Sequence, residues 1–262
     1  MFQNIYQNKW VYLLIYSFKQ GNLKLRGFVL SQIGFLVELS ITLFIWGLFT
    51  NQSKDTITYF FVGFIIQRLA WNSFAGTLNQ DIVSGKLNNM LVLPIKLFPY
   101  ILIKEIGNRL LGNVLSALTI FILYPVYRDF LALPTNTTFW IFFPFLVVIA
   151  FLMDYCVSLF ISSIAFFDND YNGFIRVLLP IITIASGIRI PFGFFPEPLK
   201  TIISFNPYAW MTYQPMQIYL GKYSFNESIL FTLLGFIWVL ILLLILKILY
   251  KKALKKYEGV GL

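Results

Sequence analysis

Six charged side chains stand well inside long apolar stretches of this sequence, farther from the ends than Arg176, Arg189 and Lys247: Glu38, Arg68, Lys104, Glu105, Arg109 and Asp154. Charge is costly to remove from water, so such residues persist where they pair, bind an ion or line a polar path. Glu105 and Arg109 are four positions apart, which allows them to pair along one helical face. The expected chemistry is therefore charge pairing or the passage of a polar group. Lys104, Glu105, Arg109 and Asp154 reach similar depths in their segments and are expected to form one network.

Glu38 and Arg68 are expected to form a separate pair. At about 1.5 Å per residue, each lies about 16–18 Å into its apolar segment, 27–49 or 56–78. That depth is near the middle of a bilayer core roughly 30 Å thick. Because the two segments are consecutive and antiparallel, we predict that Glu38 pairs with Arg68. Two roles remain open, a structural pair that fixes helix rotation and the lining of a transport path.

Residues for catalysis are missing from the chain. Histidine is absent and Cys156 is the single cysteine, which excludes Cys-His nucleophiles and ordinary zinc sites. Gly85-Lys86 and Gly221-Lys222 lack the upstream glycine and the following hydroxyl of a nucleotide-binding phosphate loop. We therefore expect no enzyme activity, no metal and no cofactor on this chain.

The elements that carry these charges are predicted to be transmembrane helices. Of the 262 residues, 58% are hydrophobic and 12% are charged, and the mean hydropathy is +0.76. This is too little polar surface for a water-soluble globule, so the bilayer is the expected solvent. We predict an all-α membrane protein, one transmembrane domain over 1–262, with spans at 27–49, 56–78, 99–124, 139–167, 174–193 and 228–249.

Lysine and arginine residues predict the orientation. One side carries Lys9, Lys19, Lys24, Arg26, Lys86, Lys96, Arg176, Lys251, Lys252, Lys255 and Lys256. The other side carries Lys54, Arg128, Lys200 and Lys222. Cytoplasmic loops are the richer in basic residues, so both termini are expected in the cytoplasm of a cell-membrane protein. The formal charge of +9 is then explained without a nucleic-acid partner.

Three further segments have predicted structures. Residues 1–24 show apolar side chains at helical spacing, which favours an amphipathic helix in the membrane interface over a poorly ordered terminus. The cytoplasmic linker 79–98 shows a helical pattern that Asn79 can cap and that Gly85 and Pro94 can end. The outer segment 194–227 is rich in proline and aromatics, which favours a re-entrant hairpin over a loose loop.

The linker resembles a known family. Asp81-Ile82-Val83-Ser84-Gly85-Lys86-Leu87, followed by Leu91-Val92-Leu93-Pro94, is similar to the coupling helix of type-2 ABC transporter permeases. Two later stretches also resemble this family, Ser186-Gly187-Ile188-Arg189-Ile190-Pro191 with Phe195-Pro196, and Asn206-Pro207 with Pro215-Met216-Gln217. The basic ending from Lys256 to Gly261 is similar to a bacterial branch in which two permeases share one ATPase.

The resemblance implies a division of labour between subunits. ATP and Mg would bind in two copies of a partner ATPase, and a second permease, identical or paralogous, would complete the path. The ATPase-coupling residues it implies are Asp81, Ile82, Gly85, Lys86, Leu87, Leu91 and Pro94. An outer gate would include Gly187, Pro191, Phe195, Pro196, Asn206 and Pro207. Spans one, two and five would line the path, which adds Asn72 to Glu38 and Arg68.

The expected function is thus the permease subunit of an ATP-driven exporter, with membrane lipids around it. The aromatic, weakly polar interior favours an amphipathic, drug-like or lipid or natural-product substrate. A self-sufficient channel or ion-coupled secondary transporter is the alternative, with Glu38, Arg68 and Asp154 carrying the ion coupling. A membrane scaffold or immunity protein that moves no substrate is a third possibility.

Overall fold

The computed structural model describes residues 9–22, 25–51, 53–70, 75–92, 96–134, 136–167 and 171–257, and all regular structure in these ranges is helical. The α-helices are α2 Lys9–Asn22, α3 Leu25–Phe49, α4 Lys54–Ala70, α5 Ala75–Val83, α6 Leu87–Leu91, α7 Leu97–Tyr127, α8 Thr137–Ser163, α9 Tyr171–Ala185, α10 Glu197–Ser204, α11 Tyr213–Tyr219 and α12 Phe225–Lys256. Short 3-10 turns are η1 Arg128–Phe130, η2 Ile164–Phe166, η3 Phe192–Phe194 and η4 Pro207–Met211.

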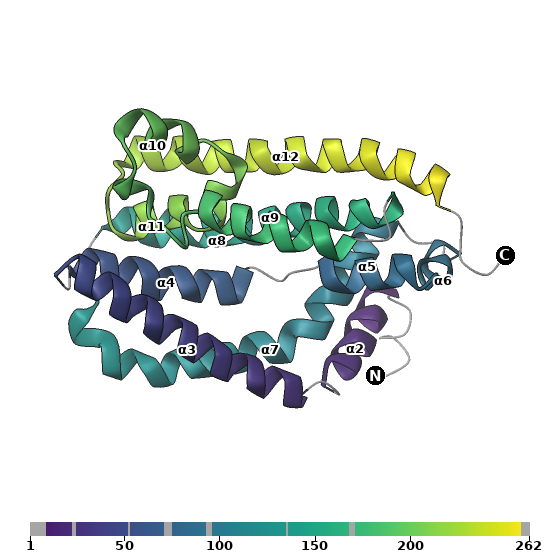
Figure 1. The fold of residues 1–262 in the computed structure, drawn as a ribbon, viewed down its shortest axis with the longest axis horizontal. Helices are drawn as coiled ribbons and strands as arrows, with labels where there is room; N and C mark the ends of the chain where they lie inside the picture. The colour runs from purple at the N-terminus through teal and green to yellow at the C-terminus, as the bar shows by residue number, and fades with distance from the viewer. Residues whose placement is uncertain are drawn as a thin grey trace.

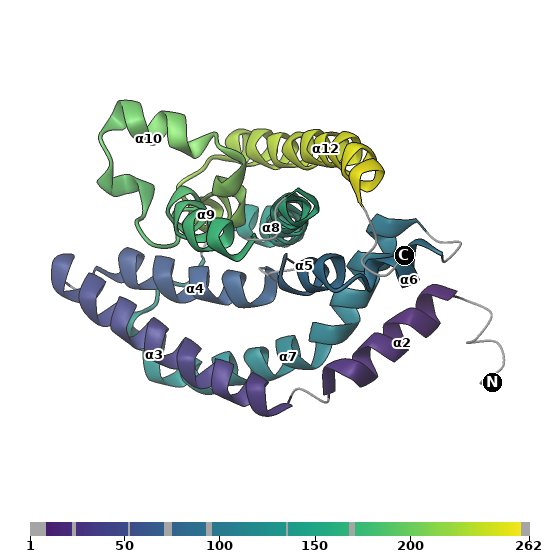
Figure 2. The same cartoon turned by 45° about the vertical axis from the view of Figure 1, so that its right-hand side comes forward.

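The long helices lie side by side along the longest axis of the molecule (Figure 1). Helix α8 runs through the middle, between α12 on one side and α4 and α5 on the other (Figure 2). Its apolar window is 67% buried, whereas the windows of α3 and α12 are 17% and 22% buried. Helix α12 is nevertheless the most apolar of these three. Apolar surface turned outward in this way fits a lipid environment and not water.

The all-α class and the presence of several apolar helices are confirmed. Within the described ranges, three helices are long and apolar enough to cross a bilayer: Val29–Phe49, Thr137–Phe166 and Phe225–Lys255. Leu97–Asn108 and Gly112–Phe130 form a fourth candidate, bent by 47°. The predicted span 56–78 is divided between α4 and α5, and α9 contains only a shorter apolar helix, so the count of six remains a prediction.

Helix α2 packs against the inner half of α7. A Cβ atom added to Gly107 would lie 2.7 Å from both the Leu14 carbonyl oxygen and the Ser17 Cβ, so the two backbones touch at this glycine. Leu13 and Ser17 are buried there, while Tyr12 and Tyr16 remain exposed. Part of the predicted apolar face is therefore covered by protein. Its placement in the membrane interface stays a prediction.

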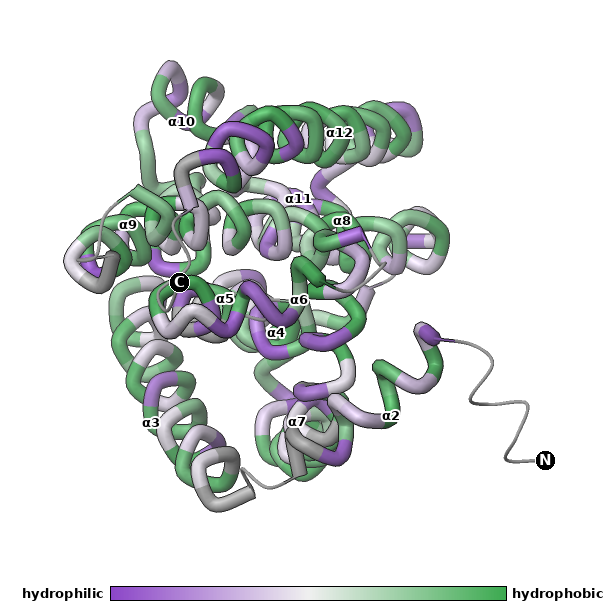
Figure 3. The backbone as a smooth tube through the Cα atoms, turned by 90° about the vertical axis from the view of Figure 1, so that its right-hand side faces the viewer, coloured by the Kyte–Doolittle hydropathy of each residue, from purple (hydrophilic) through white to green (hydrophobic). Residues whose placement is uncertain are grey.

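Two hydrophobic clusters hold the helices together. The larger surrounds the outer half of α8 and includes Phe60, Ile149 and Trp210. The smaller, the inner cluster, joins α5 and α6 to the ends of α8 and α12 through Ile82, Leu87 and other residues. Helices α3, α9 and α12 are coloured mainly as hydrophobic in Figure 3. The segments with the candidate functional residues lie at opposite ends of this bundle (Figure 1).

Candidate functional site

The predicted coupling linker forms a helix–turn–helix, here called the coupling segment and defined as residues 75–92. Helix α5 ends at a tight turn in which Gly85 has a φ of 74°, a backbone conformation that side chains other than glycine disfavour. The Gly85 N–H donates to the Ile82 carbonyl, and the Asn88 N–H donates to the Gly85 carbonyl, which starts α6. The resemblance thus placed Gly85 at the turn, whereas Pro94 lies outside the described residues.

The start of this segment differs from the expectation. Asn79 was expected to cap the helix, but α5 begins at Ala75 and Asn79 lies in its second turn. The Asn79 side chain is fully buried, and neither its amide nitrogen nor its oxygen has a hydrogen-bond partner among the described residues. A capping role needs a position before the first turn. Asn79 is instead a buried polar group, which costs stability.

The inner side of the coupling segment is fixed to several helices. The Lys104 ammonium of α7 lies 2.8 Å from the Asp81 carboxylate, and both side chains are mostly buried. Ile82 and Leu87 are buried in the inner cluster. The Tyr257 hydroxyl donates to the Ile82 carbonyl at 3.4 Å, which adds a contact from the end of α12. The segment is therefore attached to α7, α8 and α12 together.

The exposed face of the coupling segment carries apolar and basic side chains. Val92 is 85% exposed, and Val83 and Leu91 are also exposed. Lys86, which precedes the first turn of α6, is exposed as well. Neighbouring exposed apolar side chains form a surface that a protein partner or lipid can cover. Of the predicted coupling residues that the structure describes, some are buried against the bundle and others are exposed.

The intramembrane charges are arranged differently from the expectation. Glu38 was expected to pair with Arg68, but its carboxylate lies 2.6 Å from the guanidinium of Arg189, in the turn after α9. Arg68 donates to the Ser31 carbonyl at 2.7 Å and lies over the Phe35 ring. Arg68 still interacts electrostatically with Glu38. The sequence position of Glu38 gives its depth along the helix but not the direction of its side chain. Depth alone therefore does not distinguish Arg68 from Arg189 as its partner.

The second predicted network is only partly described. Lys104 pairs with Asp81 on the coupling segment, a partner that the sequence did not suggest. Glu105 and Asp154 are 2% and 6% exposed, as expected for residues inside a helical bundle. The side chain of Arg109 and all of Asn72 lie outside the described residues. Lys104 therefore pairs outside the predicted group of four, and the network itself stays a prediction.

At the opposite end, residues 186–223 form a structure called here the outer cap. Gly187 has a φ of 81°, and a Cβ added there would lie 2.8 Å from the Tyr59 hydroxyl. That hydroxyl donates to the Gly187 carbonyl at 2.9 Å. The Tyr213 N–H donates to the Ser186 carbonyl, which joins α11 to the same turn. The predicted gate residue Gly187 is thus where α4, α9 and α11 meet.

Within the cap, proline and asparagine residues mark where the short helices begin and end. Pro191 is buried before η3, and Pro196 precedes α10, with Phe195 half-buried between them. The Asn206 side chain accepts from the Tyr208 N–H at 2.8 Å and donates to the Ala185 carbonyl, while Pro207 begins η4. The cap is therefore held by defined turns and does not form a loose loop.

The interior of the cap is packed around one tryptophan. Trp210 is fully buried, and its indole N–H donates to the Phe231 carbonyl at 2.8 Å. The Tyr223 hydroxyl donates to the Gln214 side chain, whose amide donates to the Ser204 carbonyl. Buried polar groups with partners specify one arrangement of the short helices. The cap thus has its own core.

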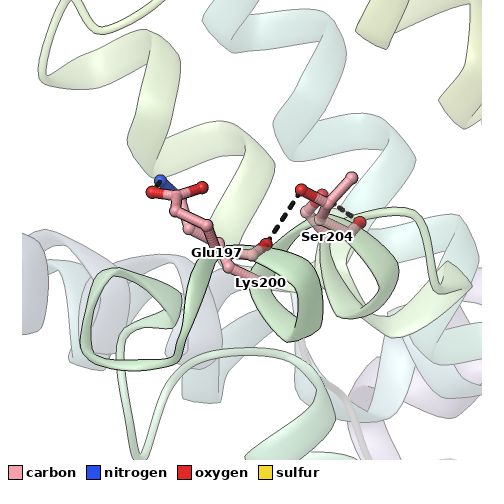
Figure 4. A network of polar contacts seen from close by, with 4 residues as sticks. Glu197, Lys200 and Ser204 are labelled. Carbon is pink, nitrogen blue, oxygen red and sulfur yellow. Dashed lines mark hydrogen bonds and ion pairs between the residues drawn. The ribbon is translucent and has the colours of Figure 1, made fainter.

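A cavity of about 670 Å³ opens between this cap and the start of α4. Two ion pairs stand at its walls, Lys222 with Asp55 at 2.6 Å and Lys200 with Glu197 at 2.9 Å. The second pair lies on α10, near the Ser204 hydroxyl (Figure 4). The hydrogen bond that Lys200 donates to the Glu197 carboxylate raises the pKa of this ammonium, so it remains charged at neutral pH.

Tyrosines line the same cavity. Burial raises the pKa of the Tyr213 and Tyr223 hydroxyls above the ordinary value, so both remain protonated at neutral pH. The cavity therefore offers hydroxyl groups, aromatic rings and paired charges. In the described residues no group of three or more acidic, histidine or cysteine side chains is placed to hold a metal.

The comparison with protein families decides the identity of the chain. A family model described as ABC-2 family transporter protein matches residues 51–261. The chain belongs to the ABC-2 transporter family. It is therefore an ABC-2 type permease, a multi-pass membrane component of an ABC transporter. A search of the curated proteins found no match to this ABC-2 permease.

Membership of the ABC-2 family gives the coupling segment its context. ABC-2 permeases work with ABC ATPase partners, and ATP is hydrolysed in that separate subunit. The matched range includes both the coupling segment and the outer cap. The sequence missed Arg189 as the partner of Glu38, Asp81 as the partner of Lys104, and the Asp55–Lys222 pair. All three join residues that are far apart in the chain, and only their opposite charges could have indicated them.

Proposed function

We propose that this ABC-2 permease is the membrane subunit of an ATP-driven exporter and that its coupling segment docks on the ATPase. The observation that carries the proposal is the two-sided nature of this segment. Asp81, Ile82 and Leu87 tie it to the bundle, while Lys86 and Val92 face outward. A segment of this kind accepts a force on one side and delivers it to the membrane helices on the other.

The transport step then follows from rigid connections. Closure of two ATPase subunits would push on the coupling segment and on α2, which is in backbone contact with α7 at Gly107. Two permeases, identical or paralogous, would enclose the path. In this proposal α3, α4 and α9 tilt apart, and Glu38, Arg68 and Arg189 present polar groups to the substrate. Glu105 and Asp154 lie deeper in the bundle and hold its helices in register.

The substrate class is proposed from the outer cavity. Its paired charges suit a polar head, and its rings, such as Phe194 and Phe205, suit an apolar body. An amphipathic drug-like, lipid or natural-product molecule has both parts. Gly187, Pro191, Phe195 and Pro196 would form the gate above it, with Asn206 and Pro207 at the hinge of the cap. Export in this direction requires both termini in the cytoplasm of a cell-membrane protein.

Co-purification with the ATPase tests the dock. The permease would be expressed with the ATPase encoded beside it, purified through a tag on the permease, and assayed for bound ATPase. Val92→Asp places a charge on the exposed face without touching the core, so we expect it to lose the ATPase. Leu133→Asp is the matched control, because Leu133 is also exposed but lies near the outer end. Retention of the ATPase by the Val92 variant would move the dock elsewhere.

Cysteine labelling tests the orientation. The native Cys156 is buried, so a membrane-impermeant maleimide should report on introduced cysteines. In intact cells we expect Asn226→Cys, in the first turn of α12, to be labelled and Lys86→Cys to be labelled only after permeabilisation. Both positions are exposed. The reverse pattern would contradict the proposed export direction and topology.

A further inference from the structure

A second large cavity is a groove between the start of α7 and the last turns of α12. Its volume is about 770 Å³. Leu240, Leu243 and Leu244 of α12 form one wall, and Phe98 forms part of the other. The Tyr250 ring stacks edge-on against Phe98 at 5.1 Å and donates its hydroxyl to the Leu159 carbonyl, which closes the floor. The groove is therefore lined by apolar side chains, and Tyr250 is held in place as its floor.

One end of the groove carries three positive charges, called here the lysine edge. Lys96 precedes the first turn of α7, and Lys247 and Lys251 are one turn apart on α12. All three are exposed, and none makes an ion pair within the described part of the chain. The described lining contains no carboxylate. The N-terminal end of α7 adds to the positive potential at this edge.

The distances along α12 match one leaflet of a bilayer. From Leu240 to Lys251 the helix rises about 16 Å, which is close to half of a core roughly 30 Å thick. In a bilayer that α12 spans, the leucines would lie toward the middle and the lysines would lie where the lipid headgroups begin. The exposed charges can reach the headgroup layer along their own alkyl chains.

We propose that this groove is a binding site for one anionic phospholipid, with its phosphate at the lysine edge and an acyl chain along the leucines. Charge complementarity selects the occupant, because three unpaired ammonium groups and no carboxylate favour an anionic headgroup over a zwitterionic one. The apolar wall excludes a free inorganic phosphate as the main ligand, since phosphate would leave the leucines uncovered. Assigning the site to the cytoplasmic leaflet rests on the proposed function, but lipid binding itself does not.

Native mass spectrometry of the purified permease, without the ATPase, tests the site. The protein would be titrated with dioleoyl phosphatidylglycerol and, separately, with dioleoyl phosphatidylcholine. The test variant is Lys247→Gln with Lys251→Gln. The matched control is Lys252→Gln with Lys255→Gln, which removes the same charge from the same helix outside the groove. A third variant, Leu244→Trp, fills the groove and keeps all charges, because Leu244 is exposed along its wall.

We expect the native chain to retain phosphatidylglycerol selectively. Each basic residue at an anionic surface contributes about fivefold, so the test variant should bind it about 30-fold more weakly. The control should change little, and the tryptophan variant should lose the bound lipid.

Equal retention of both lipids, or equal losses in test and control variants, would overturn the site. So would a test variant that keeps the lipid but loses the ATPase, since the lysines would then be a subunit contact. Failure of lipid binding with an intact ATPase pull-down would leave the proposed function standing.

Discussion

The outer cap and the coupling segment are both built from short helices joined by tight turns, yet they close on themselves to different degrees. The cap buries Trp210 completely and satisfies the polar groups of Asn206 and Gln214. The coupling segment leaves Val92 85% exposed and keeps Asn79 buried without a partner. The cap also exposes Ile202 and, among the described residues, leaves the Thr212 hydroxyl buried without a partner, so the two regions differ mainly in the large ring that the cap buries. Under the proposed function, the cap contributes stability and the coupling segment contributes the docking surface.

The largest expected effect is the loss of the cap core. Trp210→Ala removes a fully buried ring and its hydrogen bond to Phe231, so it should destabilise the protein by about 3–5 kcal/mol. Trp140→Ala is the matched control, because Trp140 on α8 is 72% exposed and should cost less than about 1 kcal/mol. Thermal unfolding in detergent measures both. Equal shifts would mean that the cap has no independent core.

Gly187→Ala should have the next largest effect. Its φ of 81° and the Tyr59 hydroxyl 2.8 Å from a new Cβ both oppose alanine, at a combined cost of about 2–3 kcal/mol. Gly193→Ala, where a Cβ meets nothing within 4 Å, serves as the control and should be neutral. The same variants should keep the ATPase in the pull-down, because the lesion lies at the other end. Loss of the ATPase would show that the two ends are not separable.

Asn79→Leu is expected to stabilise the protein. Leucine has a similar volume and needs no hydrogen bond, so the melting temperature should rise, with a gain of about 1 kcal/mol. Asn89→Leu, at an exposed position on α6, should give no gain. If the buried amide is needed when the coupling segment moves, ATP-driven transport should fall even as stability rises. A destabilised Asn79→Leu protein would mean that the amide has a partner of its own.

The ion pairs are expected to differ in their effect on coupling. Asp81→Asn should weaken stimulation of the ATPase, because Asp81 links the coupling segment to Lys104. Asp55→Asn breaks the more exposed outer pair with Lys222 and should leave stimulation unchanged. The exchanged double variant, with Asp81→Lys and Lys104→Asp, should recover part of the lost stimulation. No recovery would mean that the pair does not transmit force.

The sequence predicted the local features of both regions well. The apolar runs located α3, α7, α8 and α12, and the resemblance placed Gly85 and Gly187, both of which adopt positive φ angles. These features depend on residues that are near one another in the chain. Local pattern is therefore enough to find turns and helices.

The long-range partners could not be predicted in the same way. Spacing gives the depth of Glu38 but not its direction around the helix axis, so Arg68 and Arg189 could not be told apart. Asn79 was expected to cap a helix because its type favours caps, yet packing of α5 against α8 and η2 buried it. Tertiary contacts decide such positions.

Helix α12 makes the molecule sensitive to membrane thickness. It is uncharged from Ser228 to Leu246, a run about 28 Å long at 1.5 Å per residue, which nearly equals the hydrocarbon thickness of a typical bilayer. A thinner bilayer would force this helix to tilt, because hydrophobic mismatch is relieved in that way. Its far end carries Tyr250, which packs in the inner cluster, and Tyr257, which bonds to Ile82 of the coupling segment. Tilting would therefore shift the coupling segment, so under the proposed function the thickness of the membrane would affect coupling to the ATPase.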